Sequence, residues 1–267
     1  MKPQPTKLYK YLNPARLNDA LRENGTSTLR LSPTSVLNDP FEVMPGLDEF
    51  VSEARMAKVV SKMQAAFPED APTDSMYRKE LQLRRFRREF VARHRALFDS
   101  MLGFVSLSAK PISTLMWAHY ADSFKGFVVG YDFDAIEALV PDDYSGVLAE
   151  VQYEVDRPKW ADMDTFEREE DVNQNIITCY STKSKSWEYE EEWRLILPIH
   201  LARLVGEIRV IDIPSSAVSE ILISEFTDEK LVSQIAARAA GYASATIRRV
   251  FPSKTTFECN IEAVDEF

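Results

Sequence analysis

The stretch LYKYLNPARLNDALRENGTSTLRLS, from Leu8 to Ser32, predicts a strand, a helix and a second strand. Its first residues, LYKYL, form the apolar and aromatic run that is typical of a short strand. Asn13 and Pro14 then favour a helix start, because the N–H that proline lacks has no partner in a first helical turn anyway. Gly25 is a natural stop for this helix, and STLRLS follows it as the second strand.

Strand-like runs continue to the C-terminus, and helices separate them without regular alternation. Further strands are predicted at residues 103–108, 126–133, 146–155, 191–197, 207–213, 220–224, 244–251 and 256–264, and helices at 113–122, 163–181 and 227–240. This irregular mixture favours an α+β fold over a doubly wound parallel sheet. No repeat and no linker rich in Gly, Pro or Ser divides the chain, so we expect one domain over residues 1–267.

Residues from about 47 to 100 differ from the rest and are expected to form an inserted helical hairpin. Leu83, Phe86 and Phe90 recur there at helical spacing. Arginines crowd the other faces of this helix: Arg84, Arg85, Arg87, Arg88, Arg93 and Arg95. The surface from Arg84 to Arg95 is either a solvated helix face or a docking surface for nucleic acid or an acidic partner.

Charge and cysteine usage limit the classes of function. The formal net charge of −10 disfavours generic binding to nucleic acid, to which only a local basic patch would be an exception. The start MKPQPTKLYKYLN lacks the apolar run of a signal peptide, and no stretch approaches the ~20 apolar residues of a membrane span. Cys179 and Cys259 lie far apart without CxxC spacing, which indicates a reduced, cytoplasmic context and no zinc site.

The stretch SWEYEEEWRLIL, from Ser186 to Leu197, places four carboxylates just before a run that predicts a buried strand. Side chains alternate on an extended strand, so Glu190, Glu192 and Arg194 are expected on one face and Trp193 on the core face. Such a carboxylate pair can stabilise a developing cation, bond a ligand hydroxyl or hold a divalent metal. Alternatively it is a solvated strand edge that Arg194 neutralises.

A second candidate group lies in GFVSLSAKPISTLMWAHYADSFKGFVVGYD. Ser106 and Ser108 share one face of the predicted strand. Trp117, His119 and Tyr120 fall within about one helical turn of each other. His119 could serve as a general base or bond a ligand phosphate, or it could be a structural residue beside its aromatic neighbours.

The stretch LSPTSVLNDPFE is the third region of interest. Asn38 and Asp39 precede Pro40, which predicts a turn in which their side chains bond nearby backbone groups. Glu42 follows this turn and adds a further carboxylate.

Four motifs together resemble a bacterial family catalogued as domain of unknown function number 2971. They are a YKY start, an NDPFE turn, an MWxHY helix and a WxxExEWR strand, and here LYKY, NDPFE, MWAHY and WEYEEEWR occur in that order. The resemblance runs from Leu8 to the C-terminal strands. The helical part near 47–100 matches least well, and the family name implies no activity.

The order of elements resembles, more distantly, the ADP-ribosyltransferase fold, which implies a mixed, largely antiparallel sheet core. Those enzymes carry Ser-x-Ser on a middle strand and Glu-x-Glu at the start of a later strand. Here Ser106-Leu107-Ser108 and Glu190-Glu191-Glu192 take these places. The resemblance implies that Glu192 stabilises an oxocarbenium-like transition state formed from NAD and that Glu190 positions the acceptor.

The same resemblance implies NAD as the small-molecule substrate. The residues that it places around NAD are Tyr9, Lys10, Tyr11, Ser106, Ser108, Trp117, His119 and Tyr120. The first strand lacks the His or Arg that such enzymes carry there, so Lys10 or a tyrosine would hold the phosphate or the amide. Such an enzyme would be an intracellular toxin or phage-defence effector that modifies a protein or a nucleic acid.

Two other hypotheses fit the residues. A metal-dependent nuclease or phosphohydrolase would hold Mg²⁺ with four carboxylates, those of Asp39, Glu42, Glu190 and Glu192. Lys183 or Lys185 would then lie near the scissile phosphate. A non-catalytic binding module would instead use Trp117, His119 and Trp187 with the carboxylates as a recognition pocket or a buried network.

Overall fold

A computed structural model describes residues 3–43, 99–142, 146–158 and 169–264, with positions 92 and 96 between them. The helical hairpin expected at about 47–100 lies almost entirely outside the described residues. The docking surface from Arg84 to Arg95 also lies outside them, so both stay predictions.

The largest element is an eight-stranded sheet, with strand order β13-β12-β11-β4-β1-β3-β8-β5. Its strands are β1 (Lys7–Leu12), β3 (Leu102–Ser108), β4 (Phe127–Asp132), β5 (Val147–Glu150), β8 (Glu192–Pro198), β11 (Val218–Ser224), β12 (Thr246–Pro252) and β13 (Cys259–Ala263). Every pair in this sheet is antiparallel except β11 with β12. The expectation of an α+β fold with a largely antiparallel sheet is therefore confirmed.

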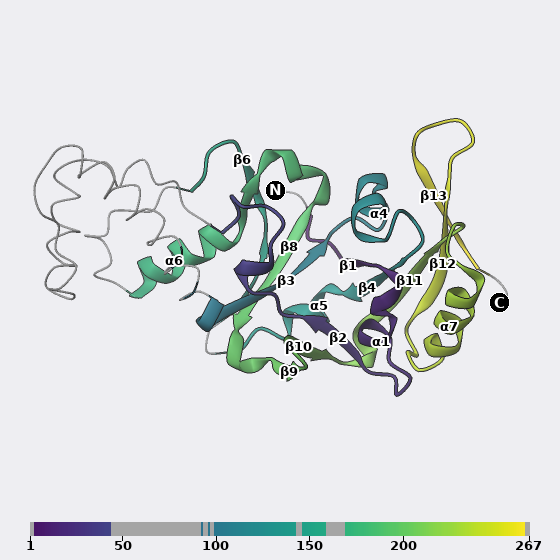
Figure 1. Cartoon of the computed structure of the whole chain (residues 1–267), viewed down its shortest axis with the longest axis horizontal. Helices are drawn as coiled ribbons and strands as arrows, with labels where there is room; N and C mark the ends of the chain where they lie inside the picture. Colours follow the sequence, from purple (N-terminus) through teal and green to yellow (C-terminus); the bar gives the residue numbers. More distant parts are fainter. Residues whose placement is uncertain are drawn as a thin grey trace, which may run out of the picture.

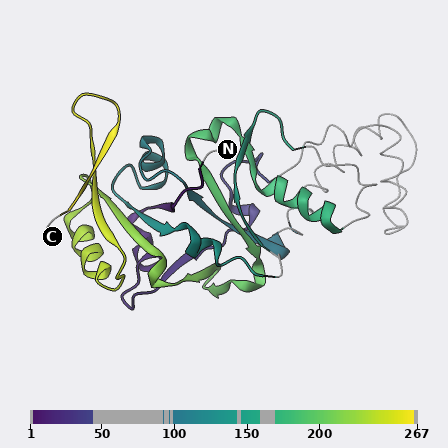
Figure 2. The same cartoon turned by 180° about the vertical axis from the view of Figure 1, so that it is seen from behind.

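Smaller elements surround this sheet. Two small sheets consist of β2 (Ser27–Arg30), β9 (Arg203–Val205) and β10 (Ile208–Ile213), and of β6 (Gln152–Glu154) with β7 (Thr182–Ser184). The helices are α1 (Leu17–Ala20), α4 (Thr114–Tyr120), α5 (Phe133–Glu137), α6 (Glu169–Tyr180) and α7 (Glu229–Ala239). Short 3-10 turns are η1 (Pro14–Arg16), η2 (Thr34–Val36), η6 (Lys185–Glu190), η7 (Ile199–Leu201) and η8 (Ser215–Ala217). Both views show α7 and β13 at one end of the described part of the chain and α6 at the other (Figure 1 and Figure 2).

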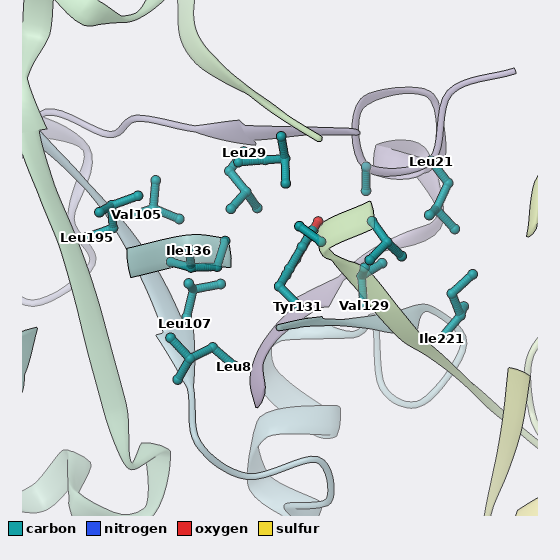
Figure 3. Packing of buried hydrophobic residues seen from close by; sticks show 14 of the residues in the cluster. Leu8, Leu21, Leu29, Val105, Leu107, Val129, Tyr131, Ile136, Leu195 and Ile221 are labelled. Carbon is teal, nitrogen blue, oxygen red and sulfur yellow. The ribbon is translucent and has the colours of Figure 1, made fainter. Parts of the chain in front are cut away.

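The two faces of the sheet pack against different partners, because side chains alternate along each strand. Leu8 faces a large core that includes residues of β3, β4 and β8. Figure 3 shows these side chains meeting Ile136 of α5 and Leu29 of β2. Tyr9 and Tyr11 face the other side, where they pack with Trp117 of α4 and its neighbours.

Strand β1 is joined unequally to its two neighbours. It pairs with β4 along its whole length, but with β3 at one register position, Tyr9 opposite Ser108. Past this position the Lys10 Nζ donates to the Ser106 carbonyl oxygen of β3 at 2.7 Å. This parting of β1 and β3 positions the site described next.

Candidate functional site

Three side chains from three strands stand in one row across the sheet. Tyr9 of β1 lies opposite Ser108 of β3, and Ser108 lies opposite Glu192 of β8. Directly opposite residues of antiparallel strands point to the same face. Tyr9, Ser108 and Glu192, which are far apart in the sequence, therefore meet on one side of the sheet.

A cavity of about 200 Å³ lies beside this row. It is lined by β1 (Tyr9, Lys10, Tyr11), β3 (Phe104, Ser106, Leu107, Ser108), α4 (Met116, Tyr120), the segment from Ser32 to Glu42 (Ser32, Val36, Leu37, Asn38, Asp39, Glu42) and the region before β8 (Lys183, Trp187, Glu190, Glu192). An apolar cavity of about 150 Å³ takes a benzene ring. The space therefore suits a six-membered ring with a substituent.

The carboxylates of Glu190 and Glu192 are buried, each residue being 3% exposed. The expectation of a solvated strand edge is therefore wrong, and so is the placing of Glu190 on the strand. Residues 185–190 form the 3-10 turn η6, and β8 begins only at Glu192. Between them Glu191 has a left-handed backbone with φ of 41°, which points its side chain outward to Lys110, 2.8 Å away. Both flanking carboxylates thereby face the cavity.

One ammonium joins three of the carboxylates. Lys183 Nζ lies 2.6 Å from Glu190 Oε2, 3.0 Å from Glu192 Oε2 and 3.5 Å from Glu42 Oε1. Tyr120 donates its hydroxyl to the other oxygen of Glu190, Oε1, at 2.6 Å. Both oxygens of Glu190 are thus occupied by buried or half-buried donors.

Arg194 adds a second buried cation to the same cluster. The predicted shared face of Glu192 and Arg194 is confirmed, since Arg194 Nε donates to Glu192 Oε1 at 2.8 Å. Arg194 also contacts Glu42 and donates to the Tyr180 carbonyl oxygen at 2.6 Å. Against the carboxylates of Glu42, Glu190 and Glu192 there are two paired cations, Lys183 and Arg194, and Lys10 of β1 lies near enough to act on Glu190 and Glu192.

Burial and neighbouring charges shift the pKa values of this cluster in opposite directions. Burial raises the pKa of Glu192 above its usual value, while the Lys183 ammonium and the Ser106 hydroxyl oppose this rise. Burial alone would lower the pKa of Lys183, but the carboxylates of Glu192 and Glu190 outweigh it and raise that pKa. Lys183 therefore stays charged and is a permanent partner of both glutamates.

The turn before Glu42 is fixed to the cavity wall. Trp187 Nε1 donates to Asp39 Oδ2 at 2.9 Å, and the backbone N–H of Phe41 donates to Asp39 Oδ1 at 2.8 Å. The second bond is the backbone contact that the sequence predicts for this turn. Lys183 Nζ lies 5.0 Å from the centre of the Trp187 ring, a cation–π distance.

Most of the residues that the resemblance placed around NAD line the cavity: Tyr9, Lys10, Tyr11, Ser106, Ser108 and Tyr120. Trp117 does not, because it is fully buried and its ring packs against Tyr11 and Phe124. His119 is exposed beside the rings of Tyr120 and Tyr189 and does not line the cavity.

Lys10 differs from the other cations at the cavity. Its side chain is half-buried, and its amino group makes one hydrogen bond, to Ser106 O, without an ion pair among the described residues. Burial lowers the pKa of Lys10 to about 8, with Arg16 and Arg30 acting in the same direction and Glu192 and Glu190 against it. Lys10 is thus a half-buried cation that no carboxylate pairs with directly in the described part of the chain.

Sequence reasoning gave Lys183 a role only in the metal hypothesis and missed Tyr153. The Tyr153 hydroxyl accepts the backbone N–H of Glu192 at 2.8 Å and so fixes the start of β8. No local pattern marks this contact, because the two residues belong to different elements. In the described part of the chain, no group of three or more His, Cys, Asp or Glu is arranged to hold a metal ion.

Comparisons with known proteins agree with the motifs. A family model described as "Protein of unknown function (DUF2971)" matches residues 116–195, which confirms the resemblance at MWAHY and WEYEEEWR. No curated protein matches the chain. Among solved structures, Thermus sp. 2.9 DarT in complex with ADP-ribosylated ssDNA is similar over 91% of each chain, with 11% identity and a TM-score of 0.34. None of the described helices is long and apolar enough to cross a membrane.

Proposed function

We propose that this protein is an NAD-dependent ADP-ribosyltransferase-like enzyme in which Glu192 is the catalytic carboxylate. The observation that carries the proposal is the row of Tyr9, Ser108 and Glu192 beside the cavity. The resemblance implies a site on these three strands and matches in Ser-x-Ser and Glu-x-Glu, whereas β1 offers Tyr9 and Lys10 where such enzymes carry His or Arg. Their meeting at one cavity is what such a reaction requires.

The reaction needs a fixed negative charge beside a sugar that becomes cationic. As the bond between the ribose C1′ and the nicotinamide nitrogen breaks, the ring takes its electron pair and leaves as neutral nicotinamide. The Glu192 carboxylate stabilises the oxocarbenium-like sugar that is left. An acceptor then forms the new bond at C1′ and releases its proton.

The cavity residues take complementary roles in this proposal. Ser106 and Ser108 shape the nicotinamide pocket, and Ser108 is held in place because its hydroxyl donates to the Glu190 carbonyl oxygen at 2.6 Å. Tyr9, Lys10 and Tyr11 contact the cofactor from β1. Trp117 braces Tyr11 from behind through an edge-on ring contact at 5.9 Å.

The acceptor would be a protein or a nucleic acid, and the biological role that of an intracellular toxin or phage-defence effector. The cytoplasm would supply both NAD and such acceptors. If the surface from Arg84 to Arg95 docks the acceptor, changing its arginines to serine will weaken modification and lysate-dependent nicotinamide release, and will leave any release without acceptor unchanged.

The test is nicotinamide release from NAD by the purified protein, with cell lysate as acceptor. Glu192→Gln is compared with Glu191→Gln, a neighbouring carboxylate that points away from the cavity to Lys110. We expect Glu192→Gln to lose release by roughly 10²-fold or more, as the loss of one transition-state charge contact does, and Glu191→Gln to keep it. The proposal would be contradicted if the wild-type protein released no nicotinamide and its melting temperature did not change on adding NAD.

One observation favours a second candidate, a metal-dependent nuclease or phosphohydrolase. The carboxylates of Asp39, Glu42, Glu190 and Glu192 do line a single cavity. Binding of Mg²⁺ measured by calorimetry, and lost in Glu190→Gln and Glu192→Gln, would support it. If Glu192→Gln instead destabilises the fold and leaves every cellular phenotype intact, the site is a binding pocket or a structural network.

A further inference from the structure

Resting on the function proposed above, we infer that Lys183 is a positioning residue that holds Glu190 and Glu192 together as one ionised unit. It does so from β7, outside both the 3-10 turn of Glu190 and the strand of Glu192. Its Nζ lies within 3.0 Å of a carboxylate oxygen of each. Lys183 therefore fixes the carboxylates relative to each other as well as to the cavity.

This arrangement changes what Glu190 contributes. Glu190 Oε2 accepts from Lys183 and Oε1 accepts from Tyr120, both at 2.6 Å. With both oxygens bound to donors inside the protein, Glu190 has little capacity left to position an acceptor. Its role in this chain is to hold Lys183 against Glu192, which differs from the role that the resemblance implies.

Glu192 depends on this contact for its charge. It is faced by Lys183 of β7, Arg194 of β8, Ser106 of β3, Lys10 of β1 and Glu190 of η6. Burial disfavours its ionised form, and the Lys183 ammonium, 3.0 Å from Oε2, opposes burial together with Arg194. Removing this ammonium leaves Arg194 as the one cation paired with Glu192 in the described part of the chain, against the desolvation cost and the Glu190 charge, so protonation of Glu192 becomes easier.

The test is the pH profile of nicotinamide release in Lys183→Met, Lys183→Arg and the wild type. Activity falls in acid as Glu192 takes up a proton. We expect the acid limb of Lys183→Met to move to higher pH by roughly one to two units, the effect of losing a nearby opposite charge. Lys183→Arg, which keeps the charge, should move it back toward the wild-type position. Lys185→Met is the matched control, because Lys185 is exposed and two residues away.

If Lys183 has a purely structural role, Lys183→Met will be less stable but its activity will fall in acid at the same pH as in the wild type. That result would overturn the inference and leave the proposed function standing. If the wild-type protein releases no nicotinamide, the proposed function fails. The coupling is then read from the carboxylate band of Glu192, by infrared difference spectra of each protein against its own Glu192→Gln variant. If this band titrates at the same pH with and without Lys183, the inference is also overturned. If it titrates at higher pH without Lys183, the coupling is supported.

Discussion

Arg194 binds both carboxylate oxygens of Glu192, the residue two positions before it on the same strand. Its Nε lies 2.8 Å from Oε1, and its Nη2 lies 3.0 Å from Oε2. Arg194 is 1% exposed, and its remaining donors reach Glu42 and the carbonyl oxygen of Tyr180. One side chain thus ties β8 to the end of α6 and to the turn that carries Glu42.

Replacing Arg194 should be costly for stability. Arg194→Met leaves Glu192 and Glu42 buried with one cation between them, and we expect a loss of about 3–5 kcal/mol in the free energy of unfolding, measured with urea. The control is Arg203→Met, since Arg203 forms the same two-pronged contact with Asp212 at 2.7 Å but in solvent. This surface pair should cost far less, because solvent screens it. Equal losses in the two variants would contradict the prediction.

Lys10 should reduce stability at neutral pH. Burial lowers its pKa from 10.5 to about 8 in the folded protein. Keeping this side chain protonated at pH 7 therefore costs the folded state free energy that the unfolded chain does not lose. Lys10→Met should therefore stabilise the protein at pH 7, by at most roughly 3 kcal/mol. Between pH 8 and pH 10.5 the folded state of the wild type binds fewer protons at this site than the unfolded state, so its stability rises with pH.

The benefit of Lys10→Met should accordingly shrink through that window and vanish near pH 10.5. Melting temperatures of both proteins across pH 7 to 10.5 check this expectation. Lys125→Met serves as control, because Lys125 is exposed. A benefit that stays constant with pH would show that the gain comes from packing and not from charge.

Tyr120→Phe should destabilise the fold through Glu190. The change removes a hydroxyl that donates to Glu190 Oε1 at 2.6 Å and leaves one oxygen of a buried carboxylate without this donor. Hydrogen bonds to charged groups contribute roughly 1.5–3 kcal/mol, and urea unfolding should show a loss of that size. Tyr189→Phe, a half-buried neighbour on η6 whose hydroxyl has no hydrogen bond in the described part of the chain, should change stability little.

Nicotinamide release should not depend on divalent metal ions. Lys183 and Arg194 already bind the carboxylates that a metal would need, so ions have nothing to add to the charge at Glu192. Treatment with EDTA should leave the rate unchanged, as should added Mg²⁺. A rate that falls with EDTA and returns with Mg²⁺ would favour the phosphohydrolase hypothesis.

Much of this site could be predicted from local patterns. Period-two alternation correctly placed Ser106 with Ser108 and Glu192 with Arg194, because these residues lie on regular strands. The same rule failed one residue earlier, at Glu190. Nothing in a glutamate at position 191 signals a left-handed backbone, which is a conformation that glycine usually supplies.

Contacts between residues far apart in the sequence could not be predicted from local patterns. Lys183 and Tyr120 both contact Glu190 through tertiary packing, and no sequence spacing reports such contacts. Trp117 and His119 were grouped with Tyr120 because a helical turn brings them close together. Their directions differ, and only the docking of α4 on β1 decides that Trp117 is buried and His119 exposed.

The row of Tyr9, Ser108 and Glu192 makes the three strands intolerant of changes in length. A single-residue insertion or deletion inside β3 would turn the remaining side chains of that strand onto the opposite face. Ser106 or Ser108 would then point into the leucine-rich core, whereas a change of length outside the strands would leave this alternation intact. In related chains that keep this chemistry, insertions and deletions should therefore lie between these strands and hardly ever within them.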